Sequence, residues 1–221
     1  MERSERDRRA ATSRRSFLTK AGIGAGLVTI GTATVPFASL LTSATAQEEP
    51  ELTDGQIAGF AESVELAAVE AHRAAAATGK LSAALVQIGM TFAQHHAEHA
   101  TAFGAAAGTD GTSKANAKLL ATVADQLANA KDQNGVLQIL FDLENAAAAT
   151  YLFAVGELDD AAAVALAASV LPVESQHAVA LGQAMGKPLA DVVPSFENQD
   201  RALDPAKFPT TTSATTTTTT K

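Results

Sequence analysis

One pattern of glutamate, histidine and tyrosine residues occurs twice in this chain, in two halves that are otherwise apolar and rich in alanine. Each copy has one residue followed by a second seven positions later, and then a pair of residues three positions apart. The first copy is Glu65, His72, His96 and His99, and the second, 78 or 79 residues further on, is Glu144, Tyr151, Glu174 and His177. Such a repeat indicates two copies of one supersecondary unit, which restricts the possible folds more than any single motif does.

Each half is predicted to form a hairpin of two helices. From Glu65 to the turn at Gly79-Lys80 the chain makes about four helical turns, and the return to His96 takes about as many. The polar residues therefore come level across the hairpin, and the second half repeats this geometry around a turn near 156–160. Two such hairpins would gather three carboxylates and three imidazoles at one height. These six candidate metal ligands are Glu65, His96, His99, Glu144, Glu174 and His177.

Capping and turn signals delimit the helices. Thr53 and Gln56 have the spacing of a capping box, so the first helix is expected to begin there. Pro172 is expected to kink the last helix or to open its hydrogen bonding. The predicted helices cover residues 54–78, 81–107, 114–131, 135–155 and 160–185. The expected fold class is all-α, an up-down four-helix bundle of two helical hairpins with a helical crossover.

Several carboxylates inside an apolar bundle require positive charge nearby. A buried carboxylate without a partner loses much of its solvation free energy. A pair of metal ions would supply the missing charge, and carboxylate oxygens together with imidazole nitrogens suit iron, manganese or zinc. Any one of these residues alone would more often be a solvated or structural side chain, so the prediction rests on the whole set.

The stretch from His95 to His99 offers a second interpretation. It contains the spacing His-x-x-Glu-His, in which two histidines bind zinc and the glutamate, here Glu98, is the general base of a peptidase. This motif is short and the domain is small for such an enzyme, so we favour the interpretation with two metal ions.

The segment from Glu174 to His177 has the Glu-x-x-His spacing of di-iron bundles. Over roughly residues 53–185 the chain resembles the ferritin-like superfamily, which includes ferritins, bacterioferritins and rubrerythrin-type proteins. The resemblance implies two bound metal ions, with iron or manganese expected and zinc possible. It leaves two functions open. One is a metal pair that reacts with oxygen or peroxide in stress protection, and the other is a non-enzymatic, metal-holding or structural envelope protein with a degraded site.

The resemblance also implies a role for each polar position. It makes Glu65 and Glu144 ligands from single helices, pairs His96 with His99 and Glu174 with His177 as ligands, and places His72 and Tyr151 beside the ligands. His96 departs from the family pattern, because the family ordinarily has a bridging glutamate there. This change removes one negative charge from the centre, which puts full oxygen-reducing activity in question.

Neighbouring residues indicate which acidic side chains face the interior. Glu65 has apolar neighbours one helical turn away, whereas Glu70 lies three residues before Arg73. Glu62 and Glu98 have polar or acidic neighbours. We therefore expect Glu65 to be the only acidic residue of the first helix that faces inward.

Residues 1–46 are predicted to form a cleaved export signal. Arg14 and Arg15 lie in a stretch that resembles the twin-arginine signal, and an apolar segment at 21–41 and a small-residue cleavage site at 44–46 follow it. A membrane anchor is the alternative, because the apolar segment approaches spanning length. The implied partner is the twin-arginine translocase, and the implied location is the periplasm, the cell wall or the extracellular space.

Composition restricts the exported part further. Removal of the signal changes the net charge from −8 to about −12, because it leaves nine basic and 21 acidic residues. This acidic balance argues against nucleic-acid binding. The chain has no cysteine, so no disulfide framework is expected. Residues 47–186 suffice for one bundle core, and a homo-oligomer is compatible with it.

Residues 187–209 are predicted to form an extended arm, because four prolines in this segment forbid a long helix. The apolar side chains expected to pack the arm against the bundle are Val192, Val193, Phe196 and Phe208. The threonine-rich tail at 210–221 is predicted to be disordered. It could serve as a glycosylated or wall-traversing stalk, or it could be a plain solvated end.

The export prediction can be tested on the arginine pair. Replacing both Arg14 and Arg15 by lysine keeps the positive charge but removes the paired guanidinium groups. We expect the precursor of this double variant to accumulate in the cytoplasm, as measured by fractionation of cells that express the full chain. Normal export of the variant would exclude the twin-arginine route.

Overall fold

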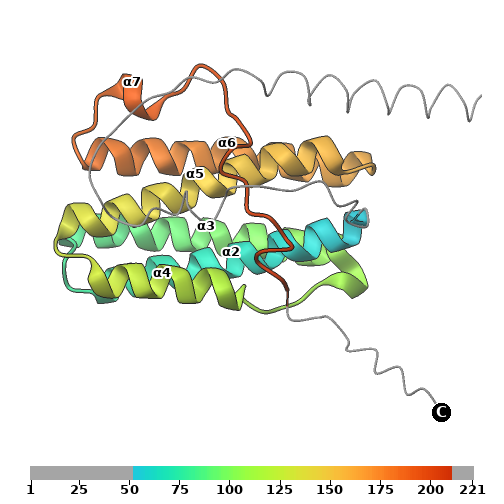
Figure 1. The fold of residues 1–221 in the computed structure, drawn as a ribbon, viewed down its shortest axis with the longest axis horizontal. Helices are drawn as coiled ribbons and strands as arrows, with labels where there is room; N and C mark the ends of the chain where they lie inside the picture. Colours follow the sequence, from blue (N-terminus) through green and yellow to red (C-terminus); the bar gives the residue numbers. More distant parts are fainter. Residues whose placement is uncertain (1–51, 211–221) are drawn as a thin grey trace, which may run out of the picture. The chain divides into compact units, whose positions relative to one another are not determined.

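The computed structural model describes residues 52–210, which are helical with no β-strand in that range. The helices are α2 (Asp54–Ala77), α3 (Ala83–Ala107), the 3-10 helix η2 (Gly108–Asp110), α4 (Ala117–Asn129), α5 (Gln133–Glu157), α6 (Ala161–Ala184) and α7 (Leu189–Val192) (Figure 1). The predicted all-α fold class is therefore confirmed. The predicted export signal, and the threonine-rich tail except for Thr210, lie outside the described residues.

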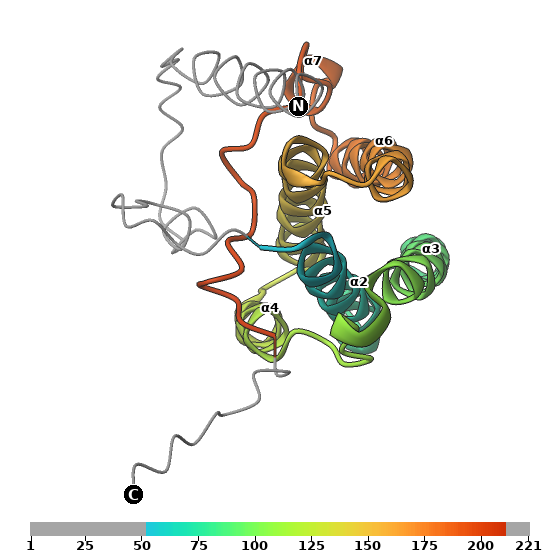
Figure 2. The same ribbon diagram turned by 90° about the vertical axis from the view of Figure 1, so that its right-hand side faces the viewer.

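Two helical hairpins form the bundle, as the repeat predicts. The first hairpin consists of α2 and α3, and the second consists of α5 and α6. Helix α2 also packs against α5, and α3 packs against α6, so the four helices close around a common interior. Helix α4 connects the hairpins and packs on the outside of α2 and α5, away from α3 and α6 (Figure 2).

Side-chain caps fix where the helices begin. The Thr53 side chain accepts a hydrogen bond from the Gln56 amide, and the Gln56 side chain accepts one from the Thr53 amide, which confirms the capping box. The crossover helix begins at Ala117, three residues later than predicted. The reason is that Asn116 caps it, with its side chain accepting from the amide of Leu119.

Glu62 corrects the expectation that Glu65 is the only inward-facing acid of the first helix. The Glu62 side chain is buried and accepts hydrogen bonds from the backbone amides of Thr112 and Ser113. Gly104 makes room for it, since a Cβ atom there would lie 2.6 Å from a Glu62 oxygen. Glu62 therefore fixes the connection between the hairpins, and loop amides replace the water that its carboxylate loses.

Two of the bundle helices, α5 and α6, are long and apolar enough to cross a membrane by length and composition. Helix α5 is mostly buried within the bundle, and both helices carry buried ionisable residues, Glu144 on α5 and Glu174 on α6. We interpret them as core helices. Helix α6 continues through Pro172, so the ring removes one backbone hydrogen bond without ending the helix.

The arm after α6 packs along α5 and reaches α4. Val192 and Phe208 are buried, as predicted, but Val193 and Phe196 are exposed. The prediction was wrong for these two. The arm is held through the buried side chains of Val192, Leu203 and Phe208 and through polar contacts. The amide of Leu203 donates to the Thr150 hydroxyl over 2.9 Å, and this bond joins the arm to α5.

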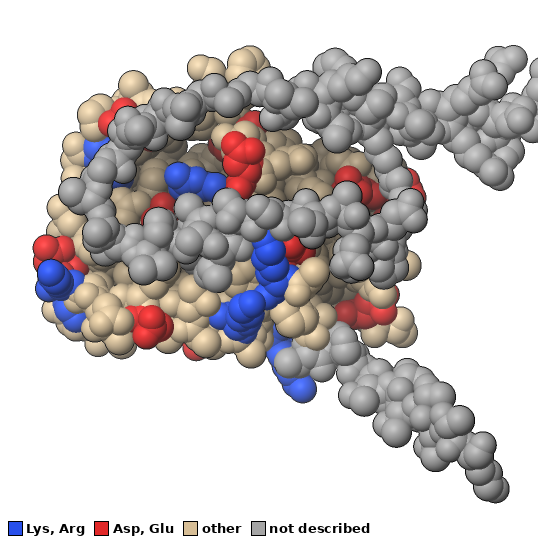
Figure 3. Space-filling view, viewed as in Figure 1, with Lys and Arg blue, Asp and Glu red and all other residues tan. Residues whose placement is uncertain are grey.

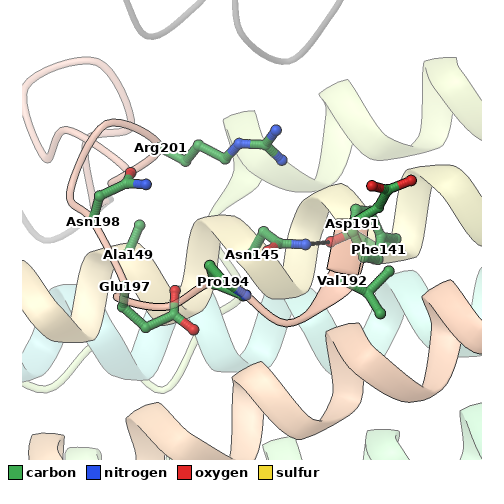
Figure 4. Close-up of a pocket in the computed structure, with 9 residues that line it drawn as sticks. All are labelled: Phe141, Asn145, Ala149, Asp191, Val192, Pro194, Glu197, Asn198 and Arg201. Carbon is green, nitrogen blue, oxygen red and sulfur yellow. Dashed lines mark hydrogen bonds between the residues drawn. The ribbon is translucent and has the colours of Figure 1, made fainter. Parts of the chain in front are cut away.

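A surface pocket of about 170 Å³ lies between the arm and α5 (Figure 4). Asn145 comes from α5, whereas Glu197 and Arg201 come from the arm. The pocket is partly closed by contacts to the helices, because Glu197 accepts a hydrogen bond from Ser175 and Arg201 pairs with Asp142. Acidic and basic side chains are interspersed on this face of the molecule (Figure 3).

Candidate metal centre

The six predicted ligands lie together in the interior of the bundle. Glu65 comes from α2, His96 and His99 from α3, Glu144 from α5, and Glu174 and His177 from α6. Their side chains form two overlapping groups of four, and within each group the potential ligand atoms lie within 4.8 Å of one another. One group is Glu65, His96, His99 and Glu174, and the other is His96, Glu144, Glu174 and His177. The two groups share His96 and Glu174.

The cluster is withdrawn from solvent. Glu144 and Glu174 have no exposed surface, and Glu65 and His96 are each 1% exposed. His99 is the most accessible of the six, with 14% of its side chain exposed. Burial of three carboxylates at one level is unfavourable unless cations or strong donors face them.

His96 lies between two carboxylates on opposite sides of its ring. Its Nδ1 atom is 2.7 Å from an oxygen of Glu65, and its Nε2 atom is 3.2 Å from an oxygen of Glu144. The helix register that directs His96 inward is therefore the one in the structure.

The other two imidazoles each approach Glu174 from a different side. His99 Nδ1 is 2.9 Å from Glu174 Oε1, and His177 Nδ1 is 3.3 Å from Glu174 Oε2. His99 also lies 3.6 Å from Glu65, and His177 lies 3.2 Å from Glu144. Each outer histidine thus faces one carboxylate of its own and one oxygen of the shared Glu174.

Several buried polar atoms of the cluster lack a hydrogen-bond partner, and a bound cation would coordinate them. Both carboxylate oxygens of Glu174 and the Nδ1 atom of His99 are buried without a hydrogen bond of good geometry to any described residue. Buried polar atoms normally have partners, so these atoms need an explanation. Oxygen and nitrogen donors at these separations fit iron, manganese or zinc, because bonds of about 2.0–2.2 Å place neighbouring ligands of one ion roughly 3–3.5 Å apart.

Tyr151 and His72 hold the two glutamates that come from single helices. The Tyr151 hydroxyl on α5 donates to Glu65 on α2, and His72 Nε2 on α2 lies 2.6 Å from Glu144 on α5. His72 belongs to neither of the two groups of potential ligands. Each hairpin therefore supplies the residue that orients the glutamate of the other hairpin.

His95 is a contact of the cluster that the sequence analysis did not assign to it. Its Nδ1 atom is 3.0 Å from Nε2 of His177, the nitrogen that points away from the carboxylates. The Phe92 ring stacks on His177 at a centroid distance of 3.9 Å. The adjacent position of His95 and His96 hid this role, because consecutive residues point about 100° apart on a helix and only one of them can lie on the inward stripe.

The zinc-peptidase interpretation finds no support in this geometry. Glu98 is exposed, accepts a hydrogen bond from Gln94, and belongs to neither group of potential ligands. His95 and His99 point to different partners, His177 and Glu174.

The cluster is electrostatically coupled even without a metal ion. Burial alone would raise the pKa of Glu65, but His96 and His99 lower it to about 2. Burial would also raise the pKa of Glu144. The imidazoles of His96, His177 and His72 outweigh burial and hold this pKa well below the usual range.

The histidines respond to the same carboxylates in the opposite sense. Burial would lower the pKa of His96, but Glu144, Glu174 and Glu65 raise it well above the usual range. For His99, burial is outweighed by Glu174 and Glu65, and the pKa rises to about 9. In the absence of metal, the protonated imidazolium groups thus compensate the negative charge of the carboxylates, as metal ions would.

Comparison with known families agrees with this geometry. The sequence profile of the ferritin-like domain matches residues 53–187, which include all six candidate ligands. The chain belongs to the ferritin-like family. Comparisons with curated proteins and with solved structures gave no match. The match spans the bundle from the cap of α2 to the end of α6. This range is close to residues 53–185, over which the sequence resembles the superfamily. The ligand roles of individual residues stay predictions.

The raised pKa of His99 predicts how the metal-free ferritin-like bundle responds to pH. A histidine whose pKa rises from 6.5 to about 9 on folding gives stability that is complete below pH 6.5 and lost as the pH rises through 9. We expect the melting temperature of the metal-free protein to fall over this interval. The fall should be smaller in the His99→Gln variant, and parallel curves for both proteins would contradict the coupling.

Proposed function

We propose that this ferritin-like protein binds two metal ions in the cluster of histidines and glutamates. The observation that carries the proposal is the pair of overlapping ligand groups, each with four donors, that share His96 and Glu174. A single ion could not use all six side chains, because the outer residues Glu65 and Glu144 flank opposite sides of His96.

The donor set favours iron or manganese, with zinc as a further possibility. Three carboxylates and three imidazoles provide hard and borderline donors and no sulfur. A bound pair of such ions would supply Lewis acidity and, for iron or manganese, redox chemistry. The protein contributes fixed ligand positions, since Tyr151 and His72 orient the carboxylates and His95 contacts the far nitrogen of His177.

We further propose that the protein acts outside the cytoplasm, in metal holding or stress protection of the cell envelope. The twin-arginine motif at Arg14 and Arg15 supports this location. That export route carries folded proteins, so a centre loaded in the cytoplasm could be exported intact.

Ligand substitution tests metal binding directly. Glu144→Ala and His177→Ala should each lower the metal content of the purified protein, because each removes a donor from one group. They should also reduce the stabilisation by metal, which is about 2.7 kcal/mol for an ion at 100 times its dissociation constant. The measurements are elemental analysis and melting curves with and without iron, manganese or zinc.

Control substitutions are available on the exposed faces of the first hairpin. Glu70 pairs with Arg73 in solvent, and Glu98 bonds only Gln94. Glu70→Ala and Glu98→Ala should leave metal content unchanged. Equal loading of all four variants would show that the ligand assignment is wrong.

Oxidation by oxygen or peroxide is a second candidate function, favoured by Tyr151. Its phenol is buried, donates to Glu65 and stacks against Phe103 at a centroid distance of 5.1 Å. Burial and the nearby carboxylates raise the pKa of Tyr151 well above the usual range, so the phenol keeps its proton and remains a donor. It is thus positioned to donate a hydrogen bond next to the centre.

The redox function predicts that the iron-loaded protein consumes hydrogen peroxide. We expect Tyr151→Phe to lower the rate per bound iron ion, because Glu65 loses its donor, and to weaken iron binding by about 10–100-fold. Glu98→Ala serves as the control with an unchanged rate. Iron binding without peroxide consumption would leave metal holding as the function.

A further inference from the structure

Both ring nitrogens of His96 face carboxylates that belong to the candidate ligand set. Nδ1 is 2.7 Å from Glu65 Oε2 and Nε2 is 3.2 Å from Glu144 Oε1. The lone pairs of the two nitrogens of an imidazole point away from each other. One ion can therefore use only one of them, and the other nitrogen either holds a proton toward the carboxylate that faces it or binds a second ion.

The surroundings of the two nitrogens form two separate ligand sets. On the Nδ1 side, Glu65 lies within 3.6 Å of His99. On the Nε2 side, Glu144 lies 3.2 Å from His177. Each set has one carboxylate and one terminal imidazole of its own, so His96 stands between two similar half-sites.

Glu174 completes both half-sites with different oxygens. Its Oε1 atom is 2.9 Å from His99, and its Oε2 atom is 3.3 Å from His177. Both oxygens are buried without a hydrogen bond of good geometry to a described residue. Glu174 thus offers one oxygen to the terminal imidazole of each half-site, and its Oε2 atom lies 3.8 Å from Nδ1 of His96.

Packing holds the His96 ring in this orientation. The ring is 1% exposed, and it stacks on the ring of His72 with a centroid distance of 5.3 Å. The rings of His99 and His177 meet it edge-on. The orientation that directs one nitrogen to each half-site is therefore fixed on several sides.

We propose that His96 bridges the two metal ions through both ring nitrogens, in place of a bridging carboxylate. This inference rests on the proposed function, because it requires two bound ions. On binding, the ring gives up its remaining N–H protons to solvent and each nitrogen donates a lone pair to one ion. Glu174 would offer one oxygen to each ion.

An imidazole bridge sets the spacing of the two ions. Each Zn–N bond is about 2.0–2.1 Å long, and the width of the ring separates the two bonds. The ions then lie further apart than the roughly 3.5–4 Å that is usual for two-metal sites. His96→Glu would replace the ring by a carboxylate and let the ions approach that usual spacing.

Stepwise Zn²⁺ titration of the full chain by calorimetry tests the bridge. The wild-type protein should bind two ions. His96→Gln should weaken both binding steps by about tenfold or more, because each half-site loses a donor. The matched controls His99→Gln and His177→Gln should each weaken one step only, since each removes a donor from a single half-site.

X-ray absorption of the zinc-loaded wild-type protein provides a test that needs no variant to fold. No zinc–zinc scattering is expected at about 3.5–4 Å, whereas zinc-loaded His96→Glu should show it. A close zinc pair in the wild type, or a loss confined to one step in His96→Gln, would overturn the bridge while the binding of two ions stands. A protein that binds only one ion, or no Zn²⁺, Fe²⁺ or Mn²⁺ at all, would overturn the proposed function, and the bridge with it.

Discussion

Three buried carboxylates at one level of the bundle are the constraint on which the rest of the structure depends. Glu65, Glu144 and Glu174 come from three different helices, and the core around them is rich in alanine. Small side chains pack closely but discriminate poorly between alternative helix registers. The carboxylates do discriminate, because a shift of any helix by one residue would separate a buried charge from its partner. We infer that the polar layer fixes the register of all four helices.

Side-chain contacts between the two hairpins hold this polar layer together. Tyr151 of the second hairpin donates to Glu65 of the first, and His72 of the first contacts Glu144 of the second. The hairpins are copies in spacing but not in chemistry, since histidines replace tyrosine and glutamate at positions 72 and 96. The centre is therefore asymmetric: the first hairpin carries more imidazole and less negative charge.

Much of the arrangement was predictable, and the exceptions share one cause. The capping box at Thr53 and the four bundle helices follow from local signals, which act over a few residues. Glu62 and His95 were not identified as inward or as contacts of the cluster. Their partners, the loop amides at 112–113 and His177, are distant in the sequence. Helical periodicity predicts which residues lie on the same face of a helix. It does not predict that a loop or helix distant in the sequence will contact a residue on another face.

The sequence by itself determined the helices, the repeat and the level at which the six polar side chains meet, because helix rise and turn positions fix heights along the bundle. Only the tertiary structure decided which side chain meets which. The crossed contacts of Tyr151 and His72, and the position of His96 between Glu65 and Glu144, depend on how far apart the helices pack and how each is rotated. Those quantities arise from side-chain volumes on all four helices together, and no local pattern records them.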